Sequence, residues 1–276
     1  MIYLNGTLRP RQEGLVDIED RGFQFADGLY EVVLVRRGRP YFLTEHLDRL
    51  RLNADLIKME LPADFDRWPA VIEELIRLNS LTNGIIYLQI SRGTAPREHW
   101  SASVKSPTSV IYVKVMQDNQ EALQNGIKVK SVLDERWGWC HIKSIGLLPN
   151  VLAKEEAYRA GAKEAVFHRQ GRVTEGGSSN IFMIKNGQIR TAPADNLILN
   201  GITRRQVLHL CQRDGVPLSE EAFSLDELRA ADEAFITSTT NHVTPIVNLD
   251  DQPIGSGRPG ELTRRLQKAY LALLGD

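Results

Sequence analysis

The chain opens with a pattern of short hydrophobic runs joined by tight turns. Residues 2–8 predict a strand, a turn at Asn5-Gly6 and a returning strand, because Asn-Gly tolerates the positive φ angles that tight hairpins need. The segment 180–192 predicts a second hairpin that turns at Asn186-Gly187. Further runs predict strands at 29–35, 40–43, 85–91, 109–116, 127–134, 164–168, 197–200 and 234–239.

Apolar residues recur at helical spacing between many of these strands. Thr44 is placed to cap the first helix. Its apolar positions are Leu47, Leu50, Ala54 and Ile57. Further helices are expected at about 66–79, from a cap at Asn150 to about 160, from near Thr203, after Ser224, and at the end of the chain, where Leu262, Leu266, Tyr270 and Leu273 share a face. Thr203 with Gln206, and Ser224 with Glu227, have the spacing of capping boxes.

The mixture of strands and helices predicts an α+β protein of two domains. A chain of 276 residues is long for one hydrophobic core. We expect a smaller domain at 1–117, a linker at 118–121 within a polar stretch, and a larger β-rich domain at 122–276.

Charge and composition favour small molecules as partners. The chain has 34 Lys+Arg and 35 Asp+Glu, so its formal charge of -1 gives no basic surface for nucleic acid or an anionic membrane. It contains no signal-peptide pattern and no run of about 18 apolar residues, so a cytoplasmic protein is expected. Cys140 and Cys211 lack the spacing of a zinc site or a disulfide framework, and Cys140 is expected to be a buried thiol.

Lys143 is the first candidate for chemistry. It lies within 137–157, after an aromatic run and before an apolar segment, so we expect it to be buried and in a strand. A buried ammonium group is costly, and a desolvated lysine loses its proton readily, so that its amine can attack a carbonyl and form an imine. The alternative is a strand lysine whose ammonium group reaches solvent.

Glu175 is the second candidate. It follows a strand and precedes Gly176-Gly177, where the backbone can approach a ligand closely. A carboxylate beside a protonated ring nitrogen keeps that nitrogen charged, so that the ring can accept electrons. The alternative is an ordinary turn residue.

Two segments carry donors that suit a phosphate. The backbone N–H groups and the dipole at the start of the helix near Thr203, after Gly201, favour an anion. The loop Thr240-Asn241-His242 offers hydroxyl donors. The capping box noted above is the purely structural explanation for Thr203.

The loop 92–103 is a candidate carboxylate clamp. It carries Arg92, Arg97 and His99, and the planar donor fork of arginine fits a carboxylate. An exposed basic loop without a ligand is the alternative.

These pieces in this order resemble the class IV aminotransferases, which are pyridoxal phosphate enzymes of fold type IV, and most closely their D-amino acid branch. The resemblance runs nearly end to end. It rests on the segments 27–33, 46–50, 92–99, 143–157, 174–182, 198–204 and 237–245. Asn200 stands where proline is frequent before the Gly-Ile-Thr run.

The resemblance implies a role for each matched residue. Lys143 matches the lysine that binds pyridoxal 5'-phosphate and then moves a proton between the substrate and the cofactor, and Glu175 matches the partner of the pyridine nitrogen. The phosphate group is matched by Arg49, Ile202, Thr203, Thr239 and Thr240, and the residue packed behind the ring by Leu199. The trap for the substrate carboxylate is matched by Tyr30, Arg97 and His99. The family places the cofactor in the crevice between two domains and takes the Arg–His loop from a neighbouring subunit, which implies a homodimer.

Within the resemblance, the Arg-x-His pair favours D-amino acids, because the branched-chain aminotransferases lack it. The expected reaction is a ping-pong transamination of D-amino acids with 2-oxo acids. With the carboxylate fixed and the α-hydrogen directed at Lys143, exchanging enantiomers swaps the hydrogen with the side chain, so that proton transfer cannot align. The alternatives are a branched-chain L-amino acid aminotransferase, an aminodeoxychorismate lyase of the same fold, and a non-catalytic binder of pyridoxal phosphate.

Overall fold

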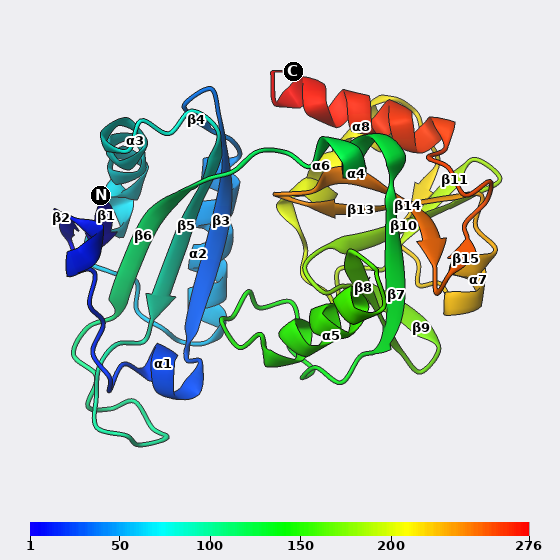
Figure 1. Cartoon of the computed structure of the whole chain (residues 1–276). Helices are drawn as coiled ribbons and strands as arrows, with labels where there is room; N and C mark the ends of the chain where they lie inside the picture. The colour runs from blue at the N-terminus through cyan, green and yellow to red at the C-terminus, as the bar shows by residue number, and fades with distance from the viewer. Residues whose placement is uncertain (276) are drawn as a thin grey trace. The chain divides into compact units, whose positions relative to one another are not determined.

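The computed structural model describes Met1–Gly275 as two compact units (Figure 1). Unit 1 comprises Met1–Gln117 and Ile142–Gly146, and unit 2 comprises Asp118–His141 and Leu147–Asp276. The segment around Lys143 thus returns to unit 1, whereas the sequence-based division assigned all of 122–276 to the larger domain. The expected linker at 118–121 also overlaps a helix that starts at Gln120.

Unit 1 is a six-stranded sheet with helices. The strands are β1 (Ile2–Leu4), β2 (Thr7–Arg9), β3 (Gly28–Arg36), β4 (Arg39–Pro40), β5 (Gly84–Ser91) and β6 (Thr108–Val115), in the order β2-β1-β6-β5-β3-β4. The helices are α1 (Arg21–Phe25), α2 (Leu43–Leu56) and α3 (Trp68–Leu78), with short 3-10 helices at η1 (Arg11–Glu13) and η2 (Phe65–Arg67). Strands β3, β5 and β6 pair antiparallel along their lengths and form the centre of the sheet.

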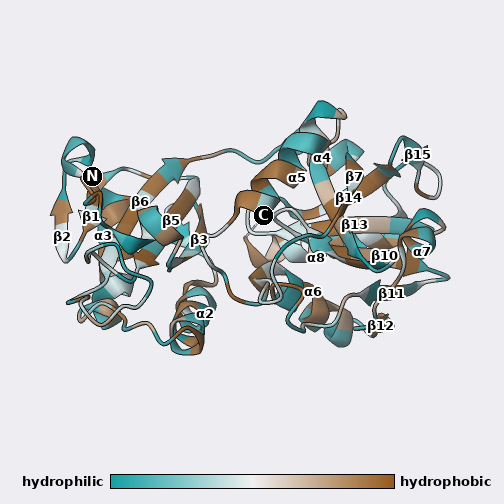
Figure 2. Ribbon diagram, turned by 90° about the horizontal axis from the view of Figure 1, so that it is seen from below, coloured by the Kyte–Doolittle hydropathy of each residue, from teal (hydrophilic) through white to brown (hydrophobic). Residues whose placement is uncertain are grey.

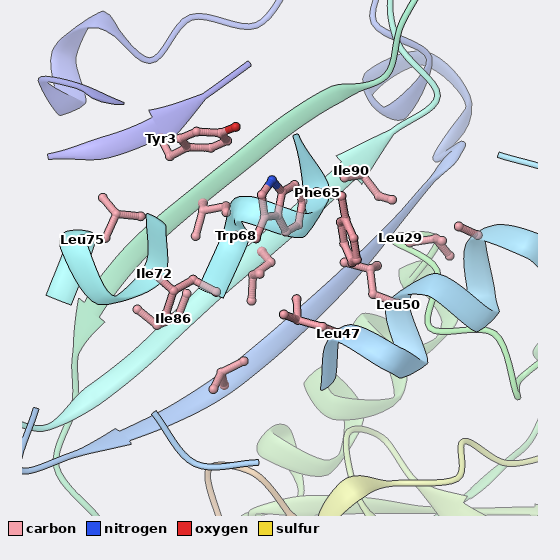
Figure 3. Close-up of a cluster of buried hydrophobic side chains, with 14 of the residues drawn as sticks. Tyr3, Leu29, Leu47, Leu50, Phe65, Trp68, Ile72, Leu75, Ile86 and Ile90 are labelled. Carbon is pink, nitrogen blue, oxygen red and sulfur yellow. The ribbon is translucent and has the colours of Figure 1, made fainter. Parts of the chain in front are cut away.

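Helices α2 and α3 pack on one face of this sheet. Alternate residues of the central strands, such as Leu29 and Ile86, meet the apolar side chains of both helices (Figure 3). Trp68, at the start of α3, is fully buried and contacts Phe65 with ring centroids 4.9 Å apart. Helix α2 carries both hydrophobic and hydrophilic residues, as expected of a helix with one buried side (Figure 2).

In unit 1 the sequence predicts the turn between β1 and β2 correctly, but not the start of α2. Asn5 and Gly6 have φ angles of 48° and 85° and join β1 to β2, as predicted. Helix α2 begins at Leu43, so the prediction that Thr44 caps it is wrong. Phe42 occupies the cap position with a φ of 56°, and this left-handed residue ends the predicted strand 40–43 at Pro40.

Unit 2 contains a nine-stranded mixed sheet. Its strands are β7 (Ile127–Leu133), β8 (Glu164–Arg169), β9 (Arg172–Gly176), β10 (Asn180–Lys185), β11 (Gln188–Thr191), β12 (Leu218–Ser219), β13 (Glu233–Ser238), β14 (His242–Leu249) and β15 (Gln252–Pro253). The order is β12-β11-β10-β13-β14-β7-β8-β9, and β15 pairs with β14. Its helices are α4 (Gln120–Asn125), α5 (Leu148–Arg159), α6 (Ile202–Arg213), α7 (Leu225–Arg229) and α8 (Glu261–Leu273). The sequence patterns missed α4 and β14.

The helix starts in unit 2 test three predicted caps. Ser224 and Glu227 form the predicted capping box of α7. Helix α5 begins at Leu148 with Pro149 in its first turn, so Asn150 is inside the helix and the predicted cap is wrong. Helix α6 begins after Gly201, which places Thr203 within the first turn, so the predicted capping box at Thr203 is also wrong.

Two further features of the described residues bear on function. None of the helices in Met1–Gly275 is long and apolar enough to cross a membrane. Over the same residues, acidic, histidine and cysteine side chains form no cluster that could hold a metal ion. The mixed helix and sheet content in two units is the predicted α+β class.

Candidate active site

Lys143 lies in a loop that is tied to unit 1 through its main chain. Its N–H donates to the side-chain oxygen of Asn53 at 2.5 Å, and its carbonyl accepts the N–H of Tyr30 at 3.1 Å. Ile142 is buried in the core of unit 1, and Ser144 forms an isolated bridge with Leu29. The predicted strand around Lys143 is therefore wrong, because short contacts to β3 and α2 replace a strand ladder.

The amine of Lys143 lies over an aromatic ring. Its Nζ is 4.1 Å from the centroid of the Tyr30 ring. Tyr30 stacks on Tyr87 of the neighbouring strand with centroids 5.8 Å apart. The side chain of Lys143 is half-buried, so the prediction of a buried lysine is only partly met. The structure brings two predicted site residues, Lys143 and Tyr30, into direct contact.

Arg49, the third predicted residue in this region, is held by a buried carboxylate. Glu31 on β3 is fully buried and receives Arg49 Nε at 2.7 Å and Nη2 at 2.8 Å, while His46 Nδ1 lies 2.6 Å from the same carboxylate. Burial alone would raise the pKa of Glu31, but the charge and hydrogen bonds of Arg49 bring it well below the usual range. Burial lowers the pKa of His46 in spite of Glu31. Glu31 thus fixes the guanidinium of Arg49 on the side of α2 that faces the sheet.

The predicted clamp loop is anchored to α1. Arg21 donates to the main-chain carbonyls of Glu98 and His99 at 2.6 and 3.1 Å. Arg97 and His99 are exposed and both lie against Phe25, with the Arg97 guanidinium 4.9 Å from that ring centroid. These two side chains are therefore grouped and accessible.

Arg92 does not join the clamp. It forms an ion pair with Asp27 at 2.9 Å and donates to the carbonyls of Ile57 and Lys58. Its function in the structure is to fix the base of the loop, which is a correction to its predicted place beside Arg97.

Glu175, in unit 2, is a buried carboxylate on β9 rather than a turn residue. It accepts Arg136 Nη1 at 2.5 Å, the N–H of Leu199 at 2.9 Å and the amide of Asn180 at 3.3 Å. Burial raises the pKa of Glu175 to about 7, although Arg136 and the N–H of Leu199 act in the opposite direction. At this carboxylate the effect of burial therefore outweighs that of its hydrogen-bond donors.

Arg136 is itself shared between two carboxylates. Its Nε and Nη2 donate to Asp134 at 2.9 Å, which leaves Nη1 for Glu175. Asp134 is further bound by Thr174 at 2.8 Å and Arg169 at 3.2 Å. Burial raises the pKa of Asp134, but the hydrogen bonds of Arg136 lower it below its usual range. This network orients Arg136 toward Glu175.

The start of α6 is suited to an anion. Gly201 precedes the helix in an extended conformation, and none of the described side chains caps it. A Cβ at Gly201 would lie 2.3 Å from the side-chain oxygen of Asn180, so a glycine is needed for this close approach. The buried residues Ile202 and Thr203 form the first turn, and Thr203 Oγ1 is 3.4 Å from the Tyr270 hydroxyl. Helix N-termini of this kind bind phosphate through backbone N–H groups.

The remaining predicted residues flank these groups. Leu199 contacts Glu175 through its main chain, although the predicted strand 197–200 is absent from this part of the described chain. Thr239 and Thr240 lie in the turn between β13 and β14 and are half-buried. The candidate residues of each unit suit pyridoxal phosphate chemically. Unit 1 offers the amine of Lys143 and the guanidinium of Arg49. Unit 2 offers the buried carboxylate of Glu175 and the N-terminus of α6.

Comparison with known proteins identifies the family. Residues 28–249 match the family model for amino-transferase class IV, and the chain belongs to that family. It is 44% identical over 268 residues to the D-alanine aminotransferase of Bacillus licheniformis, an alignment that covers 97% of this chain and 95% of that protein. It is 40% identical over 270 residues to the D-alanine aminotransferase of Staphylococcus haemolyticus, covering 98% of this chain and 96% of that protein.

The fold is also shared with solved structures. The branched-chain amino acid aminotransferase of Escherichia coli matches with a TM-score of 0.92 and 25% identity, covering 99% of this chain and 93% of that chain. A T.th. branched-chain amino acid aminotransferase with pyridoxamine 5'-phosphate matches with a TM-score of 0.92 and 26% identity, covering 99% of this chain and 94% of that chain. The predicted fold class and family are thereby confirmed.

The sequence patterns do not indicate a site role for Asn53, Arg136 or Asn180. Asn53 lies within a predicted amphipathic helix, Asn180 begins a predicted strand, and Arg136 belongs to no motif. A buried asparagine in a helix interior is unusual, so the position of Asn53 could have signalled a partner, but nothing in the sequence identified Lys143 as that partner, 90 residues away.

Proposed function

We propose that the chain transfers the amino group between D-amino acids, such as D-alanine, and 2-oxo acids, such as 2-oxoglutarate, with pyridoxal phosphate as cofactor. The observation that carries the proposal is the 44% identity to a D-alanine aminotransferase over 97% of the chain, against 25% to a branched-chain enzyme of the same fold. The contact of Lys143 with Tyr30, and the grouping of Arg97 with His99 on one exposed loop, support it.

Lys143 and Glu175 carry out the proton chemistry in this proposal. The amine of Lys143 would hold the cofactor and would move the proton at the α-carbon of the substrate. Glu175 would lie beside the pyridine nitrogen, where a carboxylate stabilises the charged form of that nitrogen. When bound, pyridoxal phosphate supplies the electron sink that makes the α-hydrogen acidic.

The other residues bind and orient. Arg49 and the backbone N–H groups at the start of α6 hold the phosphate, together with the hydroxyl groups of the threonines. The residues of this set are Arg49, Ile202, Thr203, Thr239 and Thr240. Leu199 lies behind the ring. The proposal places both sets of residues on one cofactor, as the family resemblance implies.

The substrate carboxylate is bound by Tyr30 and by the loop of Arg97 and His99. Both loop side chains are exposed in a single chain, which suits residues offered to a second copy in a homodimer. Helix α5 also exposes Leu148, Val151 and Leu152 by 60–68%, an apolar surface that a partner subunit would cover. These features support the homodimer part of the proposal.

The visible spectrum of the purified, cofactor-loaded protein tests the function. D-Alanine should convert the band of the lysine-bound cofactor to that of the amine form, and L-leucine should not. Lys143→Ala should abolish turnover and leave the cofactor removable after borohydride reduction, whereas the exposed Lys163→Ala should behave as the wild type. Conversion by L-leucine alone would instead favour a branched-chain L-amino acid aminotransferase.

A further inference from the structure

Asn53 is a buried amide in the middle of a helix. It is 3% exposed and lies on α2 among residues that pack on the sheet of unit 1. Asparagine is a poor helix former, and a buried amide costs free energy unless it has a hydrogen-bond partner. The side-chain oxygen of Asn53 has such a partner in the N–H of Lys143, at 2.5 Å.

This bond is one of two that hold the main chain of Lys143. Because Lys143 lies in a loop, no strand ladder within the described residues fixes its peptide groups. Its carbonyl is bound by Tyr30 of β3 and its N–H by Asn53 of α2. The lysine is therefore attached to a strand on one side and to a helix on the other.

The same face of α2 carries Arg49. Asn53 and Arg49 are four residues apart, so their side chains lie one above the other on the helix. Arg49 is fixed by two hydrogen bonds to the buried Glu31. The helix thus connects the guanidinium of Arg49 to the main chain of Lys143 through a single rigid turn.

We propose that Asn53 is a positioning residue: its side-chain amide fastens the main chain of Lys143 to α2 and so sets the separation between the lysine amine and Arg49. The inference rests on the proposed function, because it takes Lys143 as the residue that binds the cofactor. Bond formation between an amine and an aldehyde requires that the two approach in a narrow range of geometry. Asn53 secures that geometry without touching the cofactor.

Two forms of the cofactor distinguish a loss of lysine positioning from a general loss of structure. Pyridoxamine phosphate has no aldehyde, so its affinity for the apoprotein reports the contacts to phosphate and ring alone. Pyridoxal phosphate also forms the covalent bond with lysine, whose rate is followed by the growth of its visible band. The full-length wild type, Asn53→Ala, Asn53→Asp and Ala54→Gly would be compared, the last being a control that weakens the same buried helix without removing the hydrogen bond.

Asn53→Ala should slow covalent bond formation about tenfold and leave the dissociation constant of pyridoxamine phosphate within about twofold of the wild type. Asn53→Asp keeps the accepting oxygen and should recover most of the rate. Ala54→Gly should retain the wild-type rate. If Asn53→Ala does not fold, Asn53→Leu replaces it, with the same expected result.

Two results would overturn the inference and leave Asn53 as a structural residue only. One is a wild-type rate of covalent bond formation in Asn53→Ala. The other is a loss of affinity for pyridoxamine phosphate as large as the loss in that rate. The proposed function fails separately: in that case the wild type forms no covalent band, or Lys143→Ala still forms it.

Discussion

Replacing Glu175 by glutamine should change how the stability of the apoprotein depends on pH. Burial raises the pKa of Glu175 in the folded chain from 4.5 to about 7, in spite of Arg136. Between these two values the folded chain binds more protons than the unfolded chain, so stability falls as the pH rises through this window. The raised pKa lowers the free energy of unfolding by about 3 kcal/mol above pH 7. Below about pH 4 it lowers this free energy by nothing, because the carboxyl group is then protonated in both states.

Urea unfolding of the cofactor-free wild type and of Glu175→Gln, at several pH values from 5 to 8, measures this effect. Comparing the two proteins at each pH cancels the titration of other groups. The free energy of unfolding of Glu175→Gln, relative to the wild type, should rise by about 2 to 3 kcal/mol across the range. Glu155→Gln removes a half-exposed carboxylate, 52% accessible, and serves as the control. A difference between wild type and Glu175→Gln that stays constant with pH would show that Arg136 outweighs burial and that the carboxylate is ionised throughout.

Three further substitutions test other parts of the structure. Arg97→Ala should lower kcat/KM for D-alanine about 10- to 100-fold by removing a charged hydrogen bond, with cofactor affinity unchanged; unaltered steady-state kinetics would contradict the carboxylate clamp. Glu31→Gln should destabilise the protein by about 3–5 kcal/mol at pH 7, because it leaves the Arg49 guanidinium without its buried counter-charge. Since Arg49 holds the pKa of Glu31 well below its usual range, this loss should shrink when urea unfolding is repeated at progressively lower pH. Trp68→Ala, at a fully buried position, should cost about 3–5 kcal/mol in the same measurement, and a loss under 1 kcal/mol would show that the core of unit 1 closes around the gap.

The parts of the fold that depend on near neighbours could be predicted from the sequence. The Asn5-Gly6 turn requires only the positive φ angles that these two residues tolerate, and the Ser224–Glu227 capping box requires only their spacing. The caps of α5 and α6 could not be predicted in this way. There the chain begins its helices at Leu148 and Ile202, ahead of the polar residues Asn150 and Thr203.

The environment of Lys143 was the hardest to predict. The aromatic and apolar residues around it indicated a buried strand, yet Trp137, Trp139 and Leu148 are more than half exposed in the single chain. Apolar composition does not distinguish a residue in the core from one on a surface that another chain covers. The contacts that do hold the lysine, to Asn53 and Tyr30, join distant segments and leave no local pattern.

The ion-pair networks that hold the site residues could not be predicted from the sequence either. Glu175 was a candidate because of its place before two glycines, but its proton affinity depends on Arg136, which depends in turn on Asp134. The ion pair between Arg136 and Glu175 exists only after two segments that lie 39 residues apart have folded together.

The return of Ile142–Gly146 to unit 1 limits how the molecule can be divided. A gene fragment ending at Gln117 would encode the sheet and its helices but not the lysine that completes them. During synthesis, Tyr30 and Asn53 leave the ribosome before Lys143, so the segment Ile142–Gly146 can reach these partners only after the rest of unit 1 has been synthesised. A chimaera that exchanges unit 1 between relatives must therefore carry two inserts, one of them only five residues long.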